Sequence, residues 1–175
     1  GQGPLVLNGT NTYQGPTTVN AGTLQVKSSL YGNDESKWTP TNITVASGAA
    51  LVVNVGGSGE FTVAQAGTLF GNLKTVNNNG LKAGASIGFG TGNAGATVQT
   101  VSGILADSTG PGGGAVGLRQ VGTGPLELTG ANTYSGPTST DNNGTLKVSS
   151  FNSVSSPAAS SSLGRPTTVA NGTIQ

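Results

Sequence analysis

The sequence predicts an all-β protein, namely a right-handed parallel β-helix, also called a β-solenoid. Three observations carry this prediction. One stretch near the N-terminus recurs near the C-terminus, apolar and β-branched residues alternate with polar ones, and Gly or Asn interrupts almost every window of about ten residues. A β-sandwich is the alternative, because its turns also recur about every 8–12 residues.

The first repeated segment reads GTNTYQGPTTVNAGTLQV from Gly9 to Val26, and the second reads GANTYSGPTSTDNNGTLKV from Gly130 to Val148. Both copies keep their Gly, Pro and apolar positions, so we expect a shared backbone path and a shared inward face. A repeated tyrosine favours a packed corner, with its hydroxyl bonded to backbone. The expected structural motif has the pattern Asn-x-Tyr-x-Gly and consists of Asn11, Tyr13, Gly15, Asn132, Tyr134 and Gly136.

A shorter pattern of strand, small turn residues and strand begins at Thr17, Ile43, Phe61 and Thr167. It places Val19, Val45 and Val63 at equivalent inward positions, and no segment shows a clear helical period. At about 20–25 residues per coil the chain would make about seven or eight coils. Residues 31–42 and 108–114 are predicted loops or elaborated bends, and residues 88–95 a turn or tight bend.

Composition excludes several classes of function. Charged residues make up 7% of the chain, against about 25% in ordinary domains, and the net charge is +1 with the basic residues scattered, so nucleic acid is not expected as a partner. Without Cys or His there can be no disulfide, zinc site or Cys/His nucleophile pair. No apolar run approaches the roughly 18 residues of a membrane span. This composition favours an extracellular or bacterial cell-surface location.

Two groups of acidic residues are candidates for a saccharide site and a calcium site. Asp34 and Glu35 beside Trp38 suggest a saccharide site, with Trp38 or Tyr31 as an aromatic platform, but a solvated charged loop is favoured. The run from Asp141 to Gly144 contains part of a calcium-loop pattern, but the alternating ligands and closing Glu are missing, so a tight turn is favoured. We therefore assign no catalytic, cofactor-binding or metal-binding residue.

The segment GLRQVGTGPLELTGANTYSGPTSTDNNGTLKV, Gly117 to Val148, resembles the autotransporter-associated β-strand repeat, also called the passenger-associated transport repeat. Residues 1–26 resemble the same repeat without its lead-in. Pro16 and Pro137 depart from the family pattern, as does Arg119-Gln120. The resemblance implies a β-helical passenger of a type V secreted surface protein. Repeats of this family are thought to help the passenger fold as it emerges, and they carry no catalytic residues.

Together these features predict one β-solenoid segment over residues 1–175, with repeat modules near 1–26 and 117–148, forming part of a longer chain. Its expected function is that of a non-catalytic stalk, fibre or adhesin scaffold. A carbohydrate-binding adhesin module and a β-helix enzyme acting on polysaccharides are the alternatives. Expected partners are further coils, through end-to-end self-association or continuation of the chain, and surface glycans. No cofactor is expected.

Overall fold

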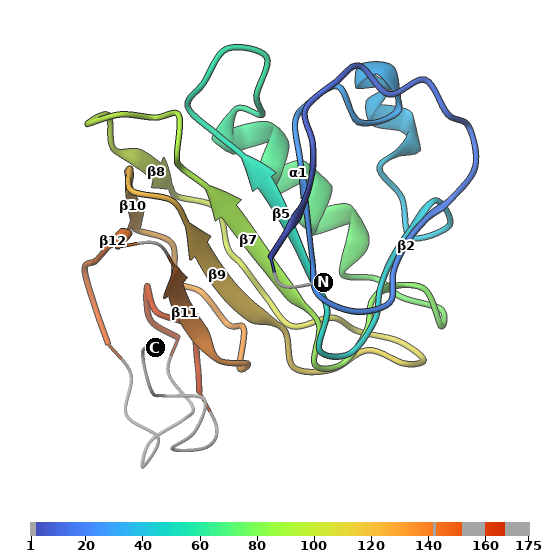
Figure 1. Cartoon of the computed structure of the whole chain (residues 1–175). Coiled ribbons are helices and arrows are strands. Elements are labelled where there is room, and N and C mark those ends of the chain that lie inside the picture. The colour runs from blue at the N-terminus through green and yellow to red at the C-terminus, as the bar shows by residue number, and fades with distance from the viewer. Residues whose placement is uncertain (1–2, 142, 152–159, 167–175) are drawn as a thin grey trace.

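The computed structural model describes residues 3–141, 143–151 and 160–166. Short parallel strands account for most of the regular structure (Figure 1). The strands are β1 (Leu5–Leu7), β2 (Thr17–Val19), β3 (Thr23–Val26), β4 (Ile43–Val45), β5 (Ala50–Asn54), β6 (Gly80–Leu81), β7 (Ser86–Gly90), β8 (Gln99–Val101), β9 (Gly117–Val121), β10 (Pro125–Leu128), β11 (Thr138–Asp141) and β12 (Thr145–Val148). The described residues also form one α-helix, α1 (Val63–Leu73), and two 3₁₀ turns (Leu30–Asn33 and Glu35–Lys37).

The strands form three sheets whose order follows the coiling of the chain. All six odd-numbered strands make one sheet, in the order β1-β3-β5-β7-β9-β11. The even-numbered strands make two three-stranded sheets, β2-β4-β6 and β8-β10-β12. Every pairing between these strands is parallel, which excludes the β-sandwich alternative and confirms the parallel β-helix.

The described residues make six coils, each with one strand in the six-stranded sheet. Coil length varies widely. Leu5 pairs with Leu24 only 19 residues later, whereas Leu51 pairs with Ile87 after 36 residues. The expected coil length of about 20–25 residues is therefore correct only for the shorter coils, and the longest coil, the third, accommodates a helix.

The core consists of rows of inward side chains stacked from coil to coil. Leu24, Leu51, Ile87 and Leu118 occupy successive register positions and are almost completely buried. Stacking of this kind keeps each apolar side chain out of water on both of its coil-facing sides, which is the main favourable contribution to folding. In the neighbouring row, Gln120 follows Phe89 and is followed by Thr140; the Gln120 Nε2 donates to the carbonyls of Gly122 and Gly124 at 3.0 and 2.9 Å.

Helix α1 corrects the expectation of strand, turn and strand from Phe61 onward. Thr62 caps the helix by accepting from the amide of Gln65, while the Gln65 side chain accepts from the amide of Thr62. Four apolar side chains at helical spacing are buried against the strands: Ala66, Leu69, Phe70 and Leu73. Val63, expected to align with Val19 and Val45, is instead the first residue of this helix.

Two predicted surface segments are also more ordered than expected. In the segment 31–42, Tyr31 in the first 3₁₀ turn and Trp38 directly after the second are buried, and the Trp38 ring lies 5.1 Å from that of Phe61. Residues 88–90, expected in a turn, belong to β7. Gly88 lies where a Cβ would stand 2.8 Å from the Arg119 carbonyl oxygen, so its lack of a side chain lets the neighbouring strand pack closely.

The N-terminal cap of α1 provides a test that residues 63–73 form a helix. Thr62→Ala removes the acceptor for the Gln65 amide and should lower the free energy of unfolding by about 1 kcal/mol. Thr68→Ala, at an exposed helical position, is the matched control and should change it by less than about 0.5 kcal/mol. Urea denaturation of both variants measures the difference, and equal midpoints would contradict the capped helix.

Candidate functional site: the repeated corner

The two Asn-x-Tyr-x-Gly motifs lie on long corners that connect strands. We call residues 8–16, between β1 and β2, the first corner, and residues 129–137, between β10 and β11, the second corner. The strands around them belong to different sheets. β1 lies in the six-stranded sheet and β2 in a three-stranded sheet, whereas for β10 and β11 the assignment is reversed. The repeat therefore specifies a local strand–corner–strand path and leaves open which side of the solenoid it occupies.

In the second corner, Asn132 joins three successive levels of the stack. Its Oδ1 accepts from the amide of Leu105 at 2.8 Å, and its Nδ2 donates to the carbonyl of Ser162 at 2.7 Å. Asn132 is completely buried. A side chain with both an acceptor and donors is needed for this role, which accounts for an amide rather than a carboxylate at this position.

Tyr134 fills the inside of the second corner, with 1% of its surface exposed. Its hydroxyl bonds Thr138 Oγ1 at 2.8 Å, at the first residue of β11. We expected this hydroxyl to bond a backbone group, and this expectation was wrong, because its partner is the Thr138 side chain. The same contact recurs in the first copy, where the Tyr13 hydroxyl lies 2.7 Å from Thr17 Oγ1.

Gly136 permits the second corner to lie flat on the coil beneath it. A Cβ at this position would stand only 2.5 Å from the carbonyl carbon of Val116, closer than real contacts allow. Gly130, at the other end of the corner, would place a Cβ 2.5 Å from the Gly103 carbonyl oxygen. Glycine is required at both positions by close approach of backbone to backbone.

The first corner has the same sequence but different surroundings. Asn11 Nδ2 donates to Gly9 within its own corner, and a Cβ at Gly9 or Gly15 would meet no atom within 4 Å. Tyr13 is 37% exposed, although its ring lies 5.0 Å from the ring of Tyr31. The packed corner expected for both tyrosines is thus found at Tyr134, while Tyr13 is exposed because no described coil lies beneath the first corner.

Each of the six carboxylates is engaged in a local structural contact. Asp34 accepts from the hydroxyl and the amide of Ser36, hydrogen bonds that lower the pKa of this carboxyl, and Glu35 accepts from Gln65 Nε2 at 2.8 Å. Trp38 is completely buried and so cannot serve as the stacking platform considered for a saccharide. Tyr31, the other aromatic considered, is only 4% exposed.

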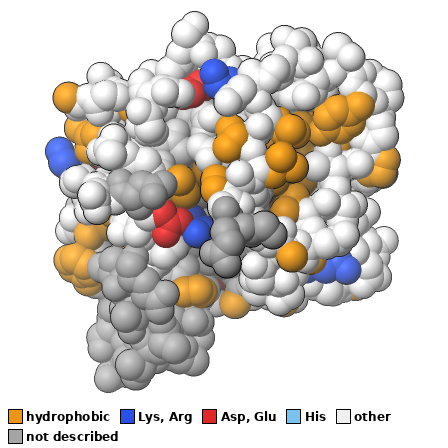
Figure 2. Space-filling model, in the orientation of Figure 1, with side chains coloured by type: hydrophobic (Ala, Val, Ile, Leu, Met, Phe, Trp, Pro, Cys, Tyr) orange, Lys and Arg blue, Asp and Glu red, His pale blue; other side chains and the backbone are white. Residues whose placement is uncertain are grey.

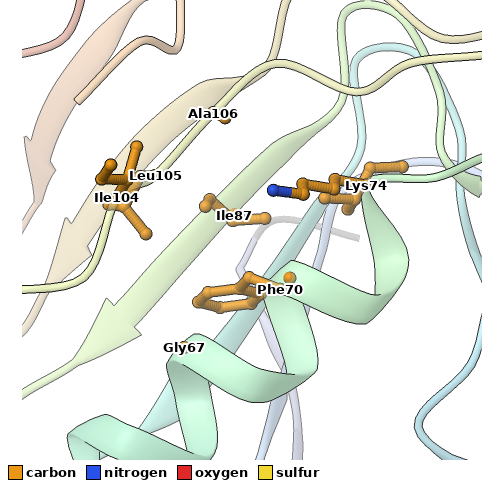
Figure 3. A pocket seen from close by; sticks show the side chains of 9 residues that line it. Gly67, Phe70, Lys74, Ile87, Ile104, Leu105 and Ala106 are labelled. Atoms are coloured by element: carbon orange, nitrogen blue, oxygen red, sulfur yellow. The ribbon is translucent and has the colours of Figure 1, made fainter.

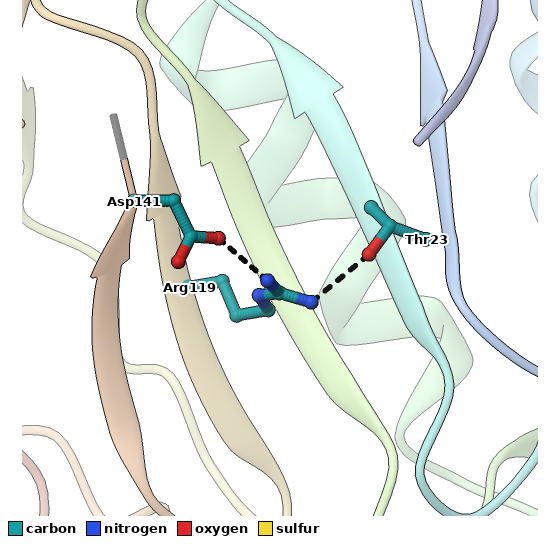
Figure 4. Close-up of polar contacts among 3 residues, drawn as sticks. All are labelled: Thr23, Arg119 and Asp141. Carbon is teal, nitrogen blue, oxygen red and sulfur yellow. Dashed lines mark hydrogen bonds and ion pairs between the residues drawn. The ribbon is translucent and has the colours of Figure 1, made fainter. Parts of the chain in front are cut away.

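Asp141, considered for a calcium loop, pairs instead with Arg119. The Arg119 guanidinium donates to Asp141 Oδ2 at 2.5 Å and to Thr23 Oγ1 at 2.9 Å, so that it lies across the outer face of the six-stranded sheet (Figure 4). Across residues 3–141, 143–151 and 160–166, no group of three or more acidic, His or Cys side chains is placed to hold a metal ion.

Two hollows border helix α1, and a third of about 410 Å³ is lined in part by the Arg119–Asp141 pair. The hollow between α1 and residues 104–106 has a volume of about 10 Å³, room for about one water molecule, and Lys74 is its one charged lining residue (Figure 3). A larger groove of about 580 Å³ between α1 and residues 100–105 has no charged residue in its lining. Charged side chains are sparse on the face shown in Figure 2. In the part of the chain that the structure describes, no helix is both long and apolar enough to cross a membrane.

The two copies of the corner allow a matched test of whether the second corner packs closely against the coil beneath it. Gly136→Ala should lower the free energy of unfolding by about 1–3 kcal/mol, because the added methyl overlaps the Val116 backbone. Gly15→Ala, the same change in the open corner, should stay within about 0.5 kcal/mol of the parent. Chemical denaturation of both variants measures the two effects, and equal effects would show that the corners are packed alike.

Alkaline titration tests the burial of Tyr134. Burial raises the pKa of its hydroxyl from 10.0 to about 12, against the opposing effect of its hydrogen bond to Thr138. Since the unfolded chain loses this proton first, the contribution is complete below about pH 10 and is lost as pH rises toward 12. The loss amounts to at most about 3 kcal/mol. Over this range Tyr134→Phe should lose less stability than the parent in urea unfolding; parallel losses would contradict a buried hydroxyl.

Comparison with known proteins identifies the two segments that contain the corners. The model of the passenger-associated-transport-repeat family matches residues 1–26 and 118–148, which cover both corners and their flanking strands and make up less than half of the chain. No curated protein and no solved structure matches the chain. Both segments that contain the Asn-x-Tyr-x-Gly motif thus match the passenger-associated-transport-repeat model.

Proposed function

We propose that this chain is a non-catalytic scaffold segment of an autotransporter passenger, exposed outside the cell, in which the repeats fasten long corners to the stack of coils. The observation that carries the proposal is the position of Asn132, which links the coil before it to residues after it through one buried amide group. The family to which the repeats are matched is associated with passenger transport.

The stack has the properties of a stalk or adhesin support. Parallel strands along the six-stranded sheet give a backbone hydrogen-bonded from coil to coil, and low charge with buried apolar rows needs no metal or disulfide for cohesion. The whole chain is proposed to act as one such segment, with further coils as its partners at the ends of the stack.

A polysaccharide-cleaving enzyme is less well supported. Such enzymes bring two carboxylates to within about 5–10 Å across a sugar-binding cleft. Here Glu60 is fixed by the Gly57 amide and Asn93, and Glu127 accepts from Thr100 in a neighbouring strand. Surface glycans remain a proposed partner of the passenger as an adhesin.

Surface delivery tests the scaffold function. The chain, joined ahead of an outer-membrane translocator, should reach the cell surface as a protease-resistant segment. Asn132→Leu, which leaves the Leu105 amide and the Ser162 carbonyl without their partner, should reduce the protease-resistant surface fraction severalfold. Asn11→Leu, in the open corner, is the matched control. Equal delivery of the parent and Asn132→Leu would contradict the proposed role, as would release of reducing ends from polysaccharides by the purified chain.

A further inference from the structure

The Asp107 carboxylate lies directly beneath the second corner, in the segment between β8 and β9. We propose that Asp107, together with the backbone of Leu105, is the recognition element that seats a repeat corner on the coil before it. This inference rests on the proposed role of the repeats as coil fasteners and names the partner that the corner requires.

The contacts of Asp107 join the end of its own coil to the corner above. Its Oδ1 accepts from the Val116 amide at 2.9 Å and from the Ser135 amide at 2.8 Å. Its Oδ2 accepts from the Ser135 hydroxyl at 2.6 Å. A carboxylate suits three converging donors, because it is acceptor-only and forms stronger hydrogen bonds than a neutral oxygen.

Leu105 contributes through its main chain. Its amide donates to Asn132 Oδ1, and its carbonyl accepts from the amides of Thr133 and Tyr134 at 2.8 and 3.2 Å. Two residues further along each segment, Asp107 meets Ser135. The two segments thus run alongside each other in the same direction, and the two-residue step from Leu105 to Asp107 matches the step from Thr133 to Ser135.

In the first corner the same motif occurs with no described counterpart of Asp107 and Leu105 beneath it. Among the described residues, no hydrogen bond from another segment reaches the amides of Thr12, Tyr13 or Gln14, and Gln14 stands where the second corner has Ser135. Tyr13 is 37% exposed and Tyr134 is 1% exposed, and the described residues place a coil beneath the second corner alone.

Substitution of Asp107 in the full chain is the first part of the test. Asp107→Ala removes the Oδ1 acceptor of the Val116 and Ser135 amides together with the Oδ2 acceptor of the Ser135 hydroxyl. We expect amide hydrogen exchange at Ser135 and Val116 to become at least about tenfold faster, with less change in the central strands β5 and β7. Glu127→Gln, which removes the carboxylate charge at an exposed contact to Thr100, is the control and should leave these two amides unchanged. Unchanged exchange in Asp107→Ala would overturn the proposal, as would a uniform acceleration across all coils.

A fusion keeps the test informative even if the Asp107 variants do not fold. A second copy of residues 99–121 is joined ahead of Gly1, which is the sequence counterpart of Gly122. We expect the added coil to protect the amides of Tyr13 and Gln14 from exchange and to reduce iodination of Tyr13. In the same fusion, replacing the copied aspartate with Ala should abolish both effects, since the native Asp107 is untouched.

The outcomes distinguish a failure of the Asp107 proposal from a failure of the proposed scaffold function. Equal protection by the fusions with and without the copied aspartate would overturn the recognition role of Asp107. It would leave the scaffold function standing, because surface delivery of the unmodified chain does not depend on the added coil. A loss of surface delivery in Asn11→Leu equal to that in Asn132→Leu would contradict the scaffold role while leaving the exchange results interpretable.

Discussion

Parallel hydrogen bonding between successive coils is the constraint on which the rest of this structure depends. A parallel strand cannot satisfy its backbone within its own coil, so each coil needs a neighbour at a fixed register. That register aligns Leu24, Leu51, Ile87 and Leu118 into a buried row. It also means that every departure from the strand path, whether corner or helix, must fit against the coil below it.

The chain meets this demand in two different ways. In the third coil the long departure folds into α1, which buries Leu69 and Phe70 against the strands and is capped at Thr62. In the second repeat the departure has no helix, and polar contacts add to the burial of Tyr134: Asn132 links the levels, and Asp107 accepts from the corner amide of Ser135. Glycine at Gly136 makes this possible, since any side chain would separate the two backbones.

The parallel solenoid could be predicted because its signals are local and repeated. Alternation such as Thr23-Leu24-Gln25-Val26 reflects the inward and outward positions of a strand, and the recurrence of Asn-x-Tyr-x-Gly reflects a corner built twice. Helix α1 was missed because Gly67 and Gly71 suggested turns, although the capping pair Thr62 and Gln65 was visible in the sequence. The exposure of Tyr13 and the burial of Trp38 could not be predicted, because both depend on which coil lies alongside.

The central claim is that the second corner is bonded to the coil beneath it, whereas the first corner, in this chain, has no described coil to bond. Residue-resolved amide hydrogen exchange of the unmodified chain tests this most directly. The account predicts that the amides of Leu105, Thr133 and Ser135 exchange as slowly as those of the flanking strands, while those of Thr12 and Gln14 exchange at nearly unprotected rates. Equal protection of the two corners, or fast exchange at Leu105 and Ser135, would contradict it.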